Sequence, residues 1–249
     1  MSISTRFVQV FAALLAGCLA LAPQTRAADL LSKQWQEQRE AMNALGDAAC
    51  KGDQQAYQRL QSLQEHQDPV AITELSWLTW EADCKPHPFK VPNSRLFEYE
   101  TLRDLAYRTT YYGYMTAAYL GYPVAQAILA ETNMNHISEA PDFRKETLCL
   151  FHLAMTGGFE TAGATLGERY LTGRGLFRSR ARAKALYNVA LGDAVQDSAM
   201  DTLKAAFPDV RHNRALAKAY LDKELAKCPE RLKVKEGRIT AFDPENTLQ

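Results

Sequence analysis

Three glycines recur along the chain at nearly constant spacing, and this recurrence constrains the fold more than any other feature. Gly121, Gly158 and Gly192 lie 37 and 34 residues apart, and each separates two segments with helical periodicity. Glycine suits the end of a helix because this position often requires a positive φ. A period of this length is typical of stacked helical hairpins, because one hairpin alone cannot bury its apolar face.

The segments between these glycines favour helices over strands. Their apolar residues recur at steps of three and four, and sustained two-residue alternation is nearly absent. Gln67-Asp68-Pro69 is a degenerate earlier copy of the glycine segment, in which Asp68 can cap a helix that begins at Pro69. The predicted helices span residues 29–50, 53–66, 69–82, 96–119, 123–133, 142–156, 160–172, 180–191, 195–206 and 212–227, with a proline-rich loop at 85–95.

The clearest single unit lies between the second and third glycines. Ala162 and Gly167 are small enough to let two helices approach closely, and Leu166 and Tyr170, one turn apart, fill the seam between them. The same unit continues with Gly173, Gly175, Ala183 and Tyr187. This pattern resembles the Sel1-like repeat, a relative of the tetratricopeptide repeat. The resemblance implies an all-α fold, an α-solenoid of about four or five stacked hairpins over residues 28–228 with a concave face.

The unit departs from the Sel1-like pattern in two places. Leu186 stands where the family often has tryptophan, and three arginines replace the usual acidic residue before the second helix: Arg178, Arg180 and Arg182. Such a basic stretch is usually a solvated face, but it could instead meet an acidic partner.

The N-terminus has the layout of a secretory signal peptide. Arg6 precedes an apolar run over residues 7–22, and a small residue, Ala27, stands at the predicted cleavage site. The run is short for a helix that spans a bilayer. We therefore expect residues 1–27 to be removed and the mature protein to reside in the periplasm.

A second processing route is open. Leu15-Ala16-Gly17-Cys18 resembles a lipobox, and cleavage before Cys18 would leave a lipid-anchored protein on the outer membrane. The residues after Cys18 prolong the apolar run instead of opening a polar tether, so the sequence favours the soluble form. Membrane association is expected only in the lipidated form.

Four cysteines remain after the signal peptide: Cys50, Cys84, Cys149 and Cys228. An even count in an oxidising compartment indicates two disulfides, although four cysteines allow three connectivities and buried free thiols are the alternative. We favour Cys50–Cys84 with Cys149–Cys228, because each pair would link neighbouring helices. The tail from residue 229 to 249 is polar and is expected to be a loose end or a short strap along the last helix.

Composition and motifs give little support to nucleic-acid binding or catalysis. The chain has 29 basic and 29 acidic residues, and removal of Arg6 and Arg26 with the signal peptide leaves a net charge of about −2, so bulk attraction to nucleic acid is absent. Neither a nucleophile elbow nor a phosphate-binding loop occurs, and the five histidines are scattered singly. His152, on an apolar helix face, is expected to be a hydrogen-bonded core residue. We expect no enzyme activity, no cofactor and no metal.

Two groups of aromatic residues are candidates for a binding surface. The first is Trp77 and Trp80, and the second is the run of tyrosines that includes Tyr111, Tyr112 and Tyr114. Such residues fill the seams of helical repeats, but tyrosine and tryptophan are also favoured anchors at protein interfaces.

The family resemblance implies a function in binding another protein. Small exported Sel1-like proteins of Gram-negative bacteria include immunity proteins that neutralise type VI secretion effectors, phospholipases among them, and envelope scaffolds. The expected function is therefore a periplasmic immunity protein whose partner is a toxin effector. An envelope scaffold or regulatory lipoprotein is the alternative, and an enzyme that acts on β-lactams is a third.

Overall fold

The computed structural model describes residues 33, 35–80, 84, 96–134, 141–192, 198–229, 232, 234–235 and 238–239, with side chains from residue 107 onward in the fourth helix. The predicted signal peptide, Cys18, the loop at 85–95 and most of the tail lie outside these residues. Within the described part, nearly all regular structure is helical, which confirms the all-α class.

The described helices are residues 35–50, α2 (Gln54–Glu65), α3 (Pro69–Trp80), α4 (Leu96–Tyr119), α5 (Pro123–Met134), α6 (Pro141–Thr156), α7 (Ala162–Thr172), α8 (Arg180–Ala190), α9 (Ser198–Ala206) and α10 (Arg214–Leu225). Two short strands in the tail, β1 (Val234–Lys235) and β2 (Arg238–Ile239), pair antiparallel. Wherever a predicted helix end falls among the described residues, it lies within three residues of the observed one.

The backbone at the recurring segments explains why they end helices. Gly121 and Gly158 have φ angles of 94° and 95°, in the left-handed region that glycine adopts without strain. Gln67, at the degenerate copy, has the same kind of conformation with a φ of 58°. Gly192 differs, because it lies outside that region and is instead packed against the carboxylate of Glu160, where a Cβ would collide. A Cβ at the third glycine would therefore meet only the end of a flexible side chain, and its φ does not require glycine.

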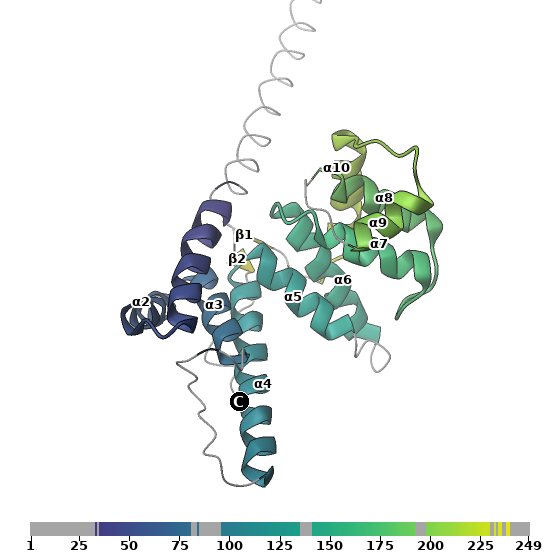
Figure 1. The fold of residues 1–249 in the computed structure, drawn as a ribbon. Coiled ribbons are helices and arrows are strands. Elements are labelled where there is room, and N and C mark those ends of the chain that lie inside the picture. The colour runs from purple at the N-terminus through teal and green to yellow at the C-terminus, as the bar shows by residue number, and fades with distance from the viewer. Residues whose placement is uncertain are drawn as a thin grey trace, which may run out of the picture.

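The helices pack in chain order along most of the molecule. From α2 to α9 each helix contacts the next, and α7 also contacts α9. The last helix leaves this order, since α10 packs back onto α6 and α8 (Figure 1). The helices α7 to α10 therefore form a group at the end of the molecule opposite to α2 and the helix over 35–50 (Figure 1).

Small residues let α7 lie close to its neighbours. A Cβ on Gly163 would stand 3.0 Å from the Leu186 carbonyl oxygen, and a Cβ on Gly167 would stand 3.0 Å from Leu203 Cδ1. Leu166 and Tyr170 on the same helix are buried in the main core. These contacts explain why the seam between α7, α8 and α9 holds glycine at two positions.

Two disulfides join segments that are distant in sequence. Cys50 is bonded to Cys84, and Cys149 of α6 is bonded to Cys228 just beyond α10, which is the pairing that the sequence favours. Leu232 of the tail is buried beside the second disulfide. Disulfides persist in oxidising surroundings, so the chain belongs to an extracytoplasmic compartment.

Across the ranges that the structure describes, no helix combines the length and the apolar character needed to cross a bilayer.

Replacing Gln67 with glycine is expected to stabilise the protein by up to about 1 kcal/mol, because glycine has no Cβ to strain at a positive φ. Gln67 is exposed, so the change removes no core packing. Urea denaturation measures the difference in the free energy of unfolding. The matched control is Gln58→Gly in the interior of α2, which should cost about 1 kcal/mol. Equal destabilisation by both variants would contradict the argument.

Removing the second disulfide through Cys149→Ala and Cys228→Ala together is expected to lower the free energy of unfolding by about 4 kcal/mol. The two cysteines are separated by 79 residues, and opening a loop of that size restores much conformational entropy to the unfolded chain. Urea denaturation of the variant and of the wild type, the latter with and without reductant, measures the loss. An unchanged midpoint in the variant would show that the disulfide contributes nothing.

Candidate functional site

A groove of about 1010 Å³ lies between α8, the segment that joins α9 to α10, and the first turn of α10. It is lined by Arg180, Ala181, Lys184, Ala185, Asn188, Ala206, Phe207, Pro208, Asp209, Val210, Arg211 and Leu216. We call this feature the α8–α10 groove. Its lining combines apolar and basic residues, a composition that suits an organic partner carrying negative charge. We call the apolar set its floor (Ala181, Ala185, Phe207, Val210 and Leu216) and the basic set its rim (Arg180, Lys184 and Arg211).

The first turn of α8 places one arginine along the groove. Ser179 caps the helix by accepting a hydrogen bond from the Arg182 amide, so α8 begins at Arg180. The Arg180 guanidinium donates to the Ala206 carbonyl oxygen at 2.8 Å and lies 4.8 Å from the centroid of the Phe207 ring. The side chain is thereby fixed across the groove by a hydrogen bond and a cation–π contact.

The segment after α9 supplies a second fixed cation. Arg211 Nη1 donates to the carbonyl oxygens of Pro208 and Val210, at 3.0 and 3.3 Å. Lys184, one turn after Arg180 on α8, adds a third positive charge to the lining, and Asp209 is the acidic residue there. Throughout the described ranges, none of the three cations has a carboxylate within 4.0 Å.

A pair of asparagines holds the other wall of the groove in place. The Asn213 side chain caps α10. The backbone N–H of Asn213 donates to Asn188 Oδ1 at 2.7 Å, and the backbone carbonyl oxygen of Asn213 accepts from Asn188 Nδ2 at 3.1 Å. His212 also contacts the Asn188 carbonyl oxygen. This reciprocal bonding fixes the start of α10 on α8 and leaves Leu216 64% exposed at the groove.

The arginines that the sequence groups together point in different directions. Arg180 lines the groove, whereas Arg178 Nε donates to the Thr172 carbonyl oxygen and Arg182 bonds the Tyr170 hydroxyl at 2.8 Å. Only one member of the predicted basic cluster therefore belongs to the groove.

Sequence reasoning missed most of the groove. The sequence predicted no role for its other contributors, among them Lys184, Phe207, Arg211 and Leu216. One signal was available, because Arg180 and Lys184 are four residues apart and so share an exposed face of α8. No sequence pattern indicated that Leu216 of α10 lines the groove, since this depends on how α10 packs against α8.

The tyrosines of α4 form a partly exposed aromatic strip. Tyr107 and Tyr112 are each 44% exposed, and the Tyr111 ring lies between them, with centroids 6.4 and 6.1 Å away. The Tyr111 hydroxyl donates to Asn133 Oδ1 on α5 at 3.0 Å, which fixes its orientation. The structure thus brings Tyr111 and Tyr112 together on one helix, apart from the α8–α10 groove.

The other aromatic candidates lie elsewhere. Trp77 packs against the N-terminal core cluster, and the side chain of Trp80 lies outside the described residues. Tyr114 is partly buried, and burial together with the nearby Glu74 raises the pKa of its hydroxyl to about 12.

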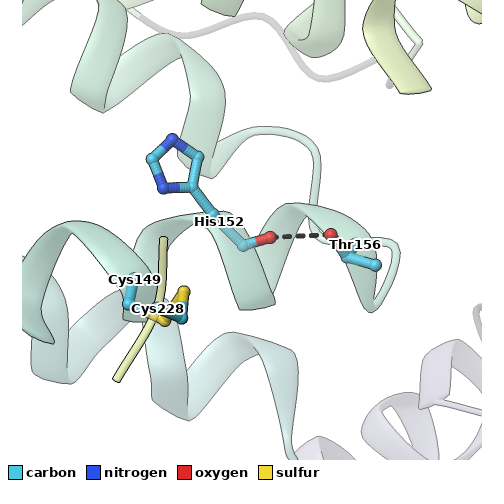
Figure 2. The surroundings of a disulfide bond; sticks show 4 residues. All are labelled: Cys149, His152, Thr156 and Cys228. Carbon is cyan, nitrogen blue, oxygen red and sulfur yellow. Dashed lines mark hydrogen bonds between the residues drawn. A yellow bond between two sulfur atoms is a disulfide. The ribbon is translucent and has the colours of Figure 1, made fainter. Parts of the chain in front are cut away.

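A cluster of polar side chains lies beside the second disulfide. Figure 2 shows His152 one turn from Cys149 on α6, with its backbone carbonyl accepting a hydrogen bond from Thr156. The imidazole is 4% exposed and its Nε2 lies 3.5 Å from the Tyr220 hydroxyl of α10. Burial lowers the pKa of His152 to about 4, with the nearby Glu224 opposing the shift. The ring is therefore neutral near pH 7.

No group of three or more histidine, cysteine or acidic side chains that could hold a metal ion is present among the residues that the structure describes. All four cysteines of that part are disulfide-bonded, so none offers a thiolate.

No family model, no curated protein and no solved structure matches this chain.

Acidification is expected to destabilise the protein through His152. The unfolded chain binds a proton on this residue below about pH 6.5, whereas the folded protein does so only below about pH 4, so stability is lost as the pH falls between these values. The full difference corresponds to about 3 kcal/mol. Urea denaturation at pH 7 and pH 4.5 should show a smaller loss for His152→Phe than for the wild type, and equal losses would contradict the assignment to His152.

Proposed function

We propose that this protein is a periplasmic protein-binding module of stacked Sel1-like hairpins. In this proposal it acts as an immunity protein that holds a secreted antibacterial effector, such as a phospholipase, against the α8–α10 groove. The observation that carries the proposal is this groove, which has an apolar floor, a basic rim and an opening to solvent.

The groove has the properties that a protein interface needs. Ala181, Val210 and Leu216 provide accessible apolar surface, and the two arginines are already held in place by backbone carbonyl oxygens. Side chains that are ordered before binding lose little conformational entropy when a partner arrives. A charged rim also speeds association and excludes partners with the wrong charge.

The two disulfides support the compartment in this proposal. Secreted effectors that act on the envelope are met outside the cytoplasm, and an immunity protein there must stay folded without cytoplasmic chaperones. Cross-links over 34 and 79 residues would each stabilise the folded state by about 4 kcal/mol. The family resemblance of the 158–192 unit supports the immunity role, and the absence of a recognisable nucleophile motif agrees with binding instead of catalysis.

A deletion strain grown in contact with its parent tests the proposal. We expect the deletion strain to be killed by the toxin-armed parent and to be rescued by a plasmid that carries the full gene. Viable counts of each strain after co-culture give the measurement. Survival of the deletion strain beside the parent would overturn the immunity role, and sensitivity to detergent without killing would favour the envelope scaffold.

A further inference from the structure

We infer that the α8–α10 groove accepts an acidic amphipathic segment of a partner protein, with carboxylates on the basic rim and an apolar side chain on the floor. This inference rests on the proposed function only in taking the partner to be a protein. It adds the chemistry by which that partner is recognised.

The charge of the groove selects the partner. Three cations and one carboxylate line it, although the whole chain carries equal numbers of basic and acidic residues. The attraction for an acidic group is therefore local to this groove. Among the described residues no carboxylate lies within 4.0 Å of Arg180, Lys184 or Arg211, so none of those carboxylates competes with a partner's Asp or Glu.

The rim is arranged before the partner arrives. Arg180 is held by the Ala206 carbonyl oxygen and the Phe207 ring, and Arg211 is held by two carbonyl oxygens of the same segment. A guanidinium has five N–H donors in a planar fork, so these bonds leave other donors for a carboxylate. The two arginines therefore offer directed hydrogen bonds as well as charge.

The floor favours an amphipathic segment over a simple anion. Leu216 is 64% exposed and lines the groove together with the partly exposed Val210. Inorganic phosphate would use only the rim and would leave this apolar surface in water. A peptide with leucine or phenylalanine between its carboxylates would cover both, in the manner of a helix bound in a groove.

The size of the groove fits such a segment. Its volume of about 1010 Å³ is comparable to sites that enclose several side chains. The Asn188–Asn213 pair holds α8 and α10 at a fixed separation, so the groove exists without a partner. We therefore expect binding of a short peptide that carries only the charge and apolar pattern.

The test uses the full mature protein and three fluorescein-labelled helical peptides of about 15 residues. One has leucines at helical spacing flanked by glutamates, the second has lysines in place of the glutamates, and the third is the glutamate peptide with its order scrambled. Fluorescence anisotropy measures each Kd. We expect the ordered glutamate peptide to bind at least about tenfold more tightly than the other two, because only it matches both rim and floor.

Variants locate the binding. Lys184→Glu should weaken binding of the glutamate peptide about tenfold and favour the lysine peptide, because an attraction becomes a repulsion. The matched control is Lys145→Glu, which makes the same charge change at an exposed position of α6 outside the groove lining and should leave the Kd unchanged. Leu216→Ser should weaken binding without unfolding the protein, since this side chain is largely exposed.

Several outcomes would overturn the inference. These are equal affinity for the glutamate and lysine peptides, an equal effect of Lys184→Glu and Lys145→Glu, or stronger binding to vesicles of anionic lipid than to any peptide. Peptide binding and survival in co-culture are separate readouts. If no glutamate peptide binds but the deletion strain is killed and its plasmid-borne gene rescues it, the acidic segment is rejected and the immunity role stands. If the peptide binds as expected but the deletion strain survives beside its parent, the immunity role is rejected and the acidic segment stands.

Discussion

The close packing of α7 against α8 is the interaction on which the rest of the C-terminal half depends. Gly163 and Gly167 bring the two helices so near that a single added Cβ would touch Leu186 of α8 and Leu203 of α9. Because α9 packs against both α7 and α8, the segment that follows α9 lies beside α8. The Phe207 ring thereby packs under the Arg180 guanidinium, and both residues line the groove. An alanine at either glycine would require its neighbours on α8 or α9 to shift by a few tenths of an ångström.

The second constraint is the return of α10 to α6. At its start the helix is tied to α8 through Asn188 and Asn213, and just beyond its end Cys228 is bonded to Cys149. A helix held at both ends has little freedom to swing away from its neighbours. This closure also buries His152 against Tyr220, which places the acid sensitivity of the protein at the same contact.

Helical geometry decides which charges act together. Arg180 and Arg182 are two residues apart, and at 3.6 residues per turn their side chains leave α8 in nearly opposite directions. One enters the groove and the other lies over Tyr170. Lys184 and Arg211 complete the basic rim from one turn along α8 and from a different segment. A chain without net charge can in this way hold a locally basic surface.

The sequence by itself determined the helices, their boundaries and the turns at Gly121 and Gly158, because these depend on periodicity, caps and φ preferences within a few residues. It also indicated the two disulfides, since their cysteines border predicted helices. Only the tertiary structure decided that Gly192 lies against the Glu160 carboxylate without a positive φ, that the predicted arginine cluster divides, and that α10 returns to α6 and α8. Those features depend on contacts between residues far apart in the chain, and local sequence patterns do not predict which distant surfaces will pack together.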